Sequence, residues 1–348
     1  MTRPSYNCLH EFGAAMLGPM LCKYVEDLRQ HSDSHTPVCL AREGWLIHQL
    51  LDSLQAQQLI SLPQQAVYLK VSRTLLFRAL LGEAELWPIA LKNSYQGTVS
   101  SLLQQRFGLQ GHEFQAFIPV KILDQAVSLP KDAGKIAGVL HKYSIKLKEQ
   151  VAETRSAFTA YLDKLGLTHG KPPLFLDVGY SGTIQKLLTL LLKRDTSGLY
   201  FVTIESGTKS VGEFKANIDG TLKNNVKWRE GCMLLDRSLF IECLMTAPHG
   251  QVIDIRQNQN GSFQFFYGQK AATQTYFQDL QIIHAGAIDA VSHALRHNIT
   301  YTSDEIAEMY DVFSQSRHAL PQEVHHLFSA DDEICGNGLV NPIDLFAI

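Results

Sequence analysis

Residues 172–193 read PPLFLDVGYSGTIQKLLTLLLK, and the fold of the chain follows from them. The first half is a short apolar run of strand length, and the second half repeats apolar residues at helical spacing. A glycine-spaced turn between the halves carries Asp177, Ser181 and Thr183. The stretch therefore predicts a strand, a loop and the start of a helix. Ligands of open α/β sheets bind at the carboxyl ends of strands, and the N–H groups of a helix N-terminus attract anions, so we expect phosphate or a metal–phosphate pair here.

The same turn also suits a purely structural role. In that interpretation Gly179 and Gly182 permit a tight bend, and Ser181 or Thr183 caps the helix after the turn. The turn by itself leaves both interpretations open.

Three other stretches extend the strand-to-helix pattern into a sheet. Strands are predicted at residues 37–41 (PVCLA), 67–71 (VYLKV) and 198–204 (GLYFVTI). Four strands separated by helical segments predict an α/β fold with a mostly parallel, Rossmann-like sheet and right-handed crossovers. Residues 205–230 are polar and ambiguous.

A long segment interrupts the predicted sheet. Residues 75–167 far exceed the length of one crossover, and their pattern is helical, so we predict a helical insertion that serves as a cap. The predicted Rossmann-like core then comprises residues 1–74 and 168–250.

The third predicted unit, residues 251–348, combines a β-hairpin with C-terminal helices. Residues 251–255 and 262–267 flank an Asn-Gly turn, which favours an antiparallel hairpin. Further helices are predicted at residues 232–245, 273–297 and 303–328, with Ser303 as the N-cap of the last.

Composition excludes several classes of protein. The 348 residues carry a formal net charge of -3 and no dense Lys/Arg stripe, so nothing favours a nucleic-acid partner. No apolar run reaches the length of a membrane span, and the amino terminus lacks the apolar core of a signal peptide, so we expect a cytoplasmic protein. The six cysteines show no paired spacing, which predicts reduced and mostly buried thiols.

The predicted strand ends bring together the residue types of a phosphate site. They carry Arg42 with Glu43, Ser72 with Arg73, and Asp177, all of which would lie on one edge of a parallel sheet. Arginine binds phosphate in a bidentate manner, and Mg²⁺ takes few carboxylates together with phosphate oxygens and water. Each pair alone also suits a structural role: Arg42 with Glu43 as a surface ion pair, and Ser72 as a helix cap.

Four stretches look like successive signatures of one family. They read CLAREGWL (39–46), VYLKVSR (67–73), LDVGYSGTIQ (176–185) and APHG (247–250). Together they resemble a haloacid dehalogenase-like (HAD-like) group found in or beside bacterial surface-polysaccharide biosynthesis proteins and often labelled predicted hydrolases. The third stretch is the most specific, and the others support it.

The resemblance implies roles for individual residues. Glu43 falls where the group usually has aspartate and where a HAD phosphatase places its nucleophile, Ser72 matches a phosphate-binding hydroxyl, and Asp177 matches the acidic metal-binding region. A working HAD site has Asp-x-Asp, whereas Trp45 occupies the second position here and cannot transfer a proton. The extra methylene of Glu43 also displaces the attacking oxygen, and a misplacement of about 1 Å can cost ~100-fold in rate. His249 is a further candidate, because it comes after a proline in a turn that matches the family.

The sequence therefore predicts Glu43 and Asp177 as catalytic and metal-binding residues, with Mg²⁺ as the cofactor. The predicted phosphate-binding residues are Arg42, Ser72, Arg73, Gly179, Ser181, Gly182 and Thr183.

Two functions remain open for a site that takes a sugar phosphate or a nucleotide sugar. The first is a Mg²⁺-dependent phosphohydrolase or phosphotransferase of surface-polysaccharide biosynthesis, with the helical insertion covering the site as a lid. The second is a catalytically inactive HAD-like binding or scaffold module that serves a glycosyltransferase or another glycan-assembly protein. Trp45 in the acid position favours the second.

Overall fold

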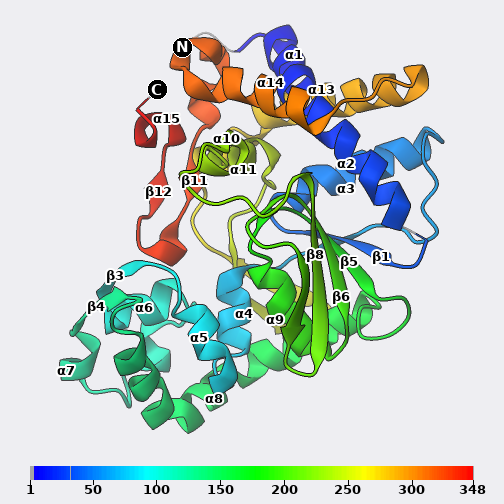
Figure 1. Ribbon diagram of the computed structural model, residues 1–348. Helices are drawn as coiled ribbons and strands as arrows, with labels where there is room; N and C mark the ends of the chain where they lie inside the picture. Colours follow the sequence, from blue (N-terminus) through cyan, green and yellow to red (C-terminus); the bar gives the residue numbers. More distant parts are fainter. Residues whose placement is uncertain (1–3, 32, 348) are drawn as a thin grey trace.

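A six-stranded sheet in the order β2-β1-β5-β6-β8-β7 forms the centre of the computed structural model, which describes residues 4–31 and 33–347 (Figure 1). The strands are β1 Thr36–Leu40, β2 Val67–Leu69, β5 Pro173–Tyr180, β6 Thr196–Thr203, β7 Gly207–Val211 and β8 Phe214–Lys223. All neighbouring strands are parallel except β7, which pairs antiparallel with β8 at the edge. The α/β fold with a mostly parallel sheet is confirmed.

The four predicted strands are present, and the ambiguous segment 205–230 adds two more. That segment forms the β7–β8 hairpin, whose edge strand β7 is mostly exposed and gave no apolar run. The strand predicted at 67–71 is shorter than expected, because β2 ends at Leu69.

Strand β5 is buried on both faces of the sheet. Leu174, Leu176 and Val178 belong to one hydrophobic core, whereas Phe175 belongs to the other. Alternate side chains of a strand point to opposite faces, so a strand covered on both sides reads as a continuous apolar run. This double burial explains why residues 173–178 were recognisable as a strand.

The first face of the sheet is covered by helices from both ends of the chain (Figure 1). These helices are α1 Tyr6–Met16, α2 Gly18–His31, α3 Gly44–Ala56, α13 Phe277–His297 and α14 Ser303–Gln315. Helices α1 and α13 approach so closely that a Cβ on Gly286 would overlap the carbonyl oxygen of His10, and a Cβ on Gly13 would overlap that of Ile283.

The segment 75–167 is mainly helical, as predicted, and it packs with the second face of the sheet. Its helices are α5 Trp87–Ala90, α6 Val99–Gln105, α7 Val120–Leu123 and α8 Ala133–Lys164, preceded by α4 Arg73–Ala79. It also contains a small unpredicted antiparallel pair, β3 Tyr95–Thr98 and β4 Ala126–Leu129. In Figure 1 this segment, coloured cyan to green, lies at the lower left.

Two buried arginines fix the helical insertion to the rest of the molecule. Arg78 donates to both carboxylate oxygens of Glu113, and its Nε lies 3.2 Å from Asp254 of strand β9 (Val252–Gln257). Arg106 donates to the carbonyl oxygens of Ala90, Asn93, Ser94 and Ile334. Each guanidinium nitrogen of both arginines has at least one partner, and such buried charges hold one arrangement because breaking a contact leaves a charge without compensation.

The C-terminal third contains the predicted hairpin, formed by β9 and β10 Phe263–Tyr267. The predicted helix 232–245 is divided into α10 Met233–Asp236 and α11 Leu239–Met245, and the predicted helix 273–297 into α12 Ala272–Thr275 and α13. The chain ends with β11 Ala330–Asp331, β12 Leu339–Val340 and α15 Pro342–Leu345.

The helix predicted at 303–328 is wrong beyond Gln315. Helix α14 ends there because Ser316 has an extended backbone (φ -142°, ψ 134°), and short 3-10 turns come next. Pro321, which lacks an N–H, would in any case stop a longer helix. Its N-cap is Thr302 rather than Ser303, since the Thr302 hydroxyl accepts a hydrogen bond from the Glu305 N–H at 3.2 Å.

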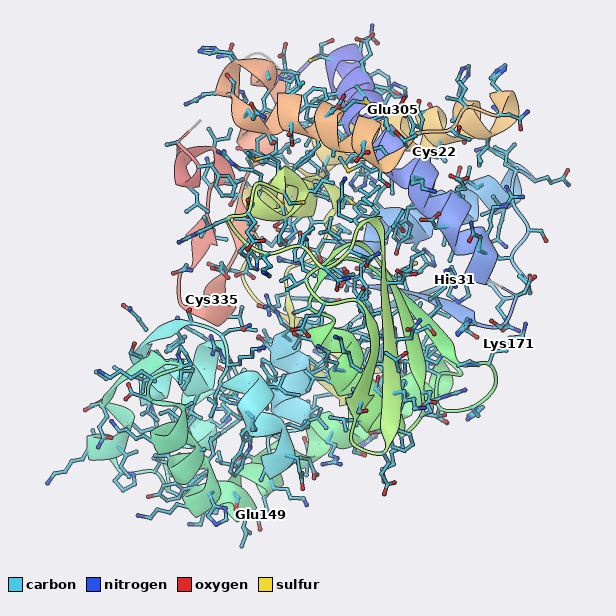
Figure 2. All side chains as sticks on the ribbon, in the orientation of Figure 1. Cys22, His31, Glu149, Lys171, Glu305 and Cys335 are labelled. Atoms are coloured by element: carbon cyan, nitrogen blue, oxygen red, sulfur yellow. The ribbon has the colours of Figure 1, made fainter. Side chains whose placement is uncertain are left out.

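All six cysteines are free thiols, three of them buried, and Cys22 and Cys335 lie in separate parts of the molecule (Figure 2). Within the described ranges, no helix combines the length and apolarity needed to cross a membrane.

The close packing of α1 on α13 predicts that Gly286→Ala destabilises the protein. The added methyl must push the two helices apart, and overpacking of this kind costs about 1–3 kcal/mol. Gly138→Ala on α8 is the matched control, because its Cβ meets nothing within 4 Å and alanine favours a helix. Urea denaturation should show a lower midpoint for Gly286→Ala and an unchanged or higher one for Gly138→Ala. Equal stability of the two variants would contradict the close packing.

Candidate functional site

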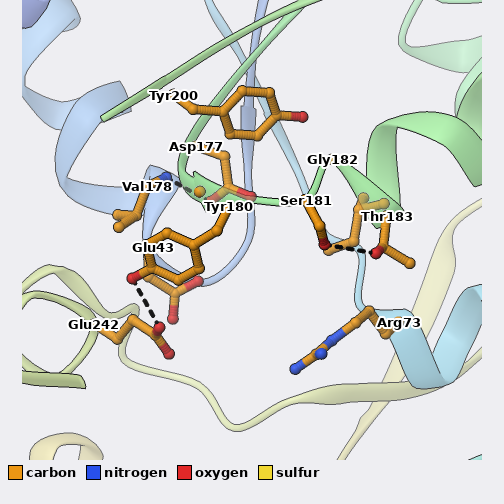
Figure 3. A pocket seen from close by; sticks show the side chains of 12 residues that line it. Glu43, Arg73, Asp177, Val178, Tyr180, Ser181, Gly182, Thr183, Tyr200 and Glu242 are labelled. Carbon is orange, nitrogen blue, oxygen red and sulfur yellow. Dashed lines mark hydrogen bonds between the residues drawn. The ribbon is translucent and has the colours of Figure 1, made fainter. Parts of the chain in front are cut away.

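A cavity of about 160 Å³ lies at the carboxyl edge of the sheet (Figure 3). It is lined by the turn after β1, the last residues of β5, the β5–α9 turn with the start of α9 (Thr183–Leu192), and one residue each of β6, α4 and α11. The described lining residues are Glu43, Arg73, Asp177, Val178, Gly179, Tyr180, Ser181, Gly182, Thr183, Ile184, Tyr200 and Glu242. None of them comes from the helical insertion, the segment expected as a lid.

The β5–α9 turn forms one wall of the cavity through its backbone. Gly182 is the N-cap of α9 and has a φ of +61°, a left-handed conformation that favours glycine. Gly179 lies so close to β6 that a Cβ would stand 2.7 Å from the Val202 carbonyl oxygen. The hydroxyls of Ser181 and Thr183 are 3.1 Å apart and point into the same region (Figure 3). The turn thus places a helix N-terminus and two hydroxyls at the cavity.

Gln185, the last residue of the motif, has a structural role. Its buried side chain accepts from the Tyr200 hydroxyl at 2.8 Å and donates to the Asn217 carbonyl oxygen at 2.9 Å. These bonds hold α9 against β6 and β8.

Asp177 lies within β5, three residues before the strand ends at Tyr180, rather than at the strand end as expected, and it is 9% exposed. One of its carboxylate oxygens accepts a hydrogen bond from the Val178 N–H at 2.8 Å. Burial, and next the repulsion from Glu43, raise the pKa of the Asp177 carboxyl well above its usual value. The predicted pair Glu43 and Asp177 is therefore brought together, close enough for each charge to oppose the other.

Glu242 is a third acidic residue of the cavity, and sequence reasoning missed it. Its carboxylate accepts a hydrogen bond from the Tyr180 hydroxyl at 3.0 Å (Figure 3). Burial, and then the charge of Glu43, raise the pKa of Glu242 to about 7. A signal was available, because Glu242 is the acidic residue inside the otherwise apolar helix LFIECLM of residues 239–245, whose other side chains are largely buried.

Arg73 is the one basic residue among the described residues that line the cavity. It begins α4, and its guanidinium extends toward the side of the cavity where Glu242 lies (Figure 3). The cavity thus combines three carboxyl groups with one guanidinium. An anion bound here needs either protonated carboxyl groups or an additional cation, because ionised carboxylates would repel it.

Two predicted phosphate-binding residues lie outside this lining. The Ser72 hydroxyl accepts from the Leu75 N–H at 3.0 Å and donates to the Val252 carbonyl oxygen, so it caps α4 and holds β9. The guanidinium of Arg42 lies 3.8 Å from both Glu43 and Asp331, which connects the β1 turn to β11. For these two residues the structural alternatives describe the observed contacts.

Trp45 and His249 also lie outside the cavity lining. Trp45 packs edge-on against Tyr68 and Phe277. His249 contacts the Tyr68 hydroxyl through Nε2 at 2.9 Å and the Gly250 carbonyl oxygen through Nδ1 at 2.9 Å. Both ring nitrogens thus have partners in the protein, and the His249 ring also lies 4.9 Å from the Tyr267 ring of β10, so His249 connects the hairpin to β2.

The residues fit Mg²⁺ only together with a bound phosphate. In the described parts of the chain, no three His, Cys, Asp or Glu side chains are grouped so that they could hold a metal ion by themselves. Mg²⁺ is commonly bound by one or two carboxylates, completed by phosphate oxygens and water. Glu43 and Asp177 would supply that pair, and a cation between them would relieve the repulsion that raises the Asp177 pKa.

Comparison with known proteins adds no relative. No family model matches the chain, and a search of curated proteins returned no significant match. Any function assigned to this protein therefore depends on the geometry and charge of the cavity.

The Gly182 conformation predicts that Gly182→Ala weakens ligand binding more than folding. Its Cβ would force a left-handed alanine and approach Ile218 to 2.7 Å, which disturbs the N–H groups at the start of α9. Gly166→Ala is the control, since Gly166 has a φ of +72° but no atom within 4 Å of an added Cβ. Thermal unfolding with and without phosphate should show loss of ligand stabilisation in Gly182→Ala alone. Full stabilisation retained by Gly182→Ala would mean that the turn is only structural.

The raised pKa of Glu242 predicts a stability that depends on pH. The folded protein holds this proton more tightly than the unfolded chain, so the contribution is complete below pH 4.5 and is lost as pH rises to about 7. The loss is on the order of 3 kcal/mol, and Glu242→Gln should make the slope shallower. Urea denaturation from pH 4.5 to 8 measures the free energy of unfolding at each pH. Glu230→Gln, at an exposed glutamate, is the control. Parallel curves for wild type and Glu242→Gln would disprove the assignment.

Proposed function

We propose that this protein is a HAD-like protein that binds a sugar phosphate or nucleotide sugar, with the phosphate in the cavity at the end of β5. One observation carries the proposal: the N-terminus of α9, the hydroxyls of Ser181 and Thr183, and the Arg73 guanidinium line the same cavity as Glu43 and Asp177. Backbone N–H groups at a helix start and a guanidinium are common partners of phosphate oxygens.

Mg²⁺ is the proposed cofactor of this site. Glu43 and Asp177 would hold it, and it would neutralise charge on the phosphate oxygens. The charge balance of the cavity supports this, because the protein supplies one guanidinium against three carboxyl groups.

We further propose that the reaction is hydrolysis or transfer of the phosphoryl group. In hydrolysis a water oxygen bonds to phosphorus, the bond from phosphorus to the alcohol oxygen breaks, and Glu43 takes the proton of the water. Glu242 gives its proton to the leaving alcohol oxygen. Burial, the first cause of the raised pKa of Glu242, favours a proton on this group, and Glu242 thus supplies the acid that Trp45 cannot. Surface-polysaccharide biosynthesis, with its phosphorylated sugars, is the proposed setting.

The alternative is a binding or scaffold module that retains the cavity without turnover and serves a glycosyltransferase or another glycan-assembly protein. The packing of Trp45 against Tyr68 and Phe277 favours it, since the β1 turn then offers no proton donor to the cavity.

Phosphate release from a panel of sugar phosphates and nucleotide sugars, assayed with Mg²⁺, tests the enzymatic proposal. Asp177→Asn and Glu242→Gln should each lower the rate by about 100-fold or more, because each removes a group used in the reaction. Thr302→Ala is the control: it loses a helix cap worth about 1 kcal/mol on α14, which contributes no residue to the described lining, so activity should remain.

The enzyme and the binding module predict different results in these experiments. Activity unchanged in Asp177→Asn would refute the site. Thermal stabilisation by these ligands without phosphate release would establish the binding module instead.

A further inference from the structure

The segment after β8 emerges at the same edge of the sheet as the cavity. Strand β8 is parallel to β6 and β5, so its carboxyl end lies beside theirs. Hydrogen bonds hold this segment: the Val226 N–H donates to Thr203 O at 3.1 Å, and the Arg229 N–H donates to a carboxylate oxygen of Asp236 at 2.6 Å. The backbone on both sides of residues 227–228 is therefore fixed.

Trp228, on this segment, is a large aromatic residue that is 50% exposed. Its ring lies edge-on to the Tyr180 ring, with centroids 6.0 Å apart and planes at 68°. Tyr180 lines the cavity and donates to Glu242. Trp228 is thus one ring removed from the cavity and next to its acidic wall.

Burial in a hydrophobic core does not explain the position of Trp228. Of the three tryptophans, Trp87 is 6% exposed and Trp45 packs between Tyr68 and Phe277, whereas Trp228 is 50% exposed. The charged neighbours Lys227 and Glu230 lie 3.5 Å apart and pair with each other. A fixed, half-exposed tryptophan offers a flat apolar surface at little cost in conformational entropy, which suits the stacking of a ring.

The size of the cavity also favours a ligand that extends beyond it. Its volume of about 160 Å³ is well below the ~300–1,000 Å³ of pockets that enclose a whole organic ligand. A phosphate bound at the start of α9 would leave the remainder of its ligand outside the cavity. Trp228 provides exposed aromatic surface one ring away from the cavity lining, through its contact with Tyr180.

We propose that Trp228 forms a second subsite. Its side chain stacks on the ring, a sugar or a nucleobase, that is bonded to the phosphate in the cavity. This inference rests on the proposed function, because the phosphate must occupy the cavity to bring the ring to Trp228. The two subsites divide recognition: the α9 turn and Arg73 bind the phosphate, and Trp228 selects ligands in which a ring is attached to it.

Calorimetric titration of wild type, Trp228→Ala and Trp228→Phe tests the subsite with three probes: inorganic phosphate, a hexose 1-phosphate and a nucleoside monophosphate. Inorganic phosphate should bind wild type and Trp228→Ala equally. At least one ring-bearing probe should bind to wild type more tightly than inorganic phosphate does. The same probe should bind to Trp228→Ala about 10-fold more weakly than to wild type. Trp228→Phe should retain most of the affinity. Tyr276→Ala, which truncates another aromatic side chain that is 50% exposed, is the matched control and should change nothing.

The results separate the two proposals. If wild type binds none of the probes, the proposed function fails, and the subsite fails with it. If wild type binds the probes but Trp228→Ala binds both ring-bearing ones as tightly, only the subsite is refuted. Fluorescence gives an independent readout, because a stacked ring should quench Trp228 in wild type and the ligand-dependent change should disappear in Trp228→Phe.

Discussion

Burial of β5 on both faces is the constraint on which the rest of the structure depends. Its side chains alternate between two hydrophobic cores, one shared with α1, α2, α3 and α13, and the other with the helical insertion. A strand held in this way ends at a fixed position, and the turn after it inherits that position. Hydrophobic packing outside the cavity therefore determines where the backbone N–H groups of α9 and the carboxyl group of Asp177 lie.

The cavity brings together acidic groups whose burial lowers the stability of the folded protein. Glu43, Asp177 and Glu242 share a small volume with one guanidinium, and the pKa values of Asp177 and Glu242 are raised by burial and by Glu43. Burial of acidic groups near one another costs free energy, which the large apolar cores of this chain can offset. Perturbed carboxyl groups in a cleft mark a candidate functional site, since such groups bind cations or transfer protons at neutral pH.

The helical insertion is fastened to the body by buried charge rather than joined by a flexible linker. Arg78 connects α4 to Glu113 and to Asp254 of β9, and Arg106 connects the end of α6 to Ile334 near the C-terminus. Both side chains are 1% exposed, so their hydrogen bonds must be kept. The insertion contributes no residue to the described cavity lining, whereas Arg73, the first residue of α4, is part of it.

The sequence by itself determined the local elements and the turn of the site. The apolar run 173–178, the glycine at 182 and the helical spacing after it predicted β5, a tight glycine turn and α9, because periodicity and glycine act over a few neighbouring residues. It also predicted that Glu43 and Asp177 would meet, since parallel strands end on one edge.

Tertiary structure alone decided which other side chains face the cavity. Ser72 and Arg73 are adjacent, yet Ser72 caps α4 while Arg73 lines the cavity. Glu242 and Trp228 come from distant segments, and their proximity to Tyr180 results from how α11 and the end of β8 pack against the sheet. Contacts between segments far apart in the chain depend on the whole packed core, and no local spacing of residues encodes them.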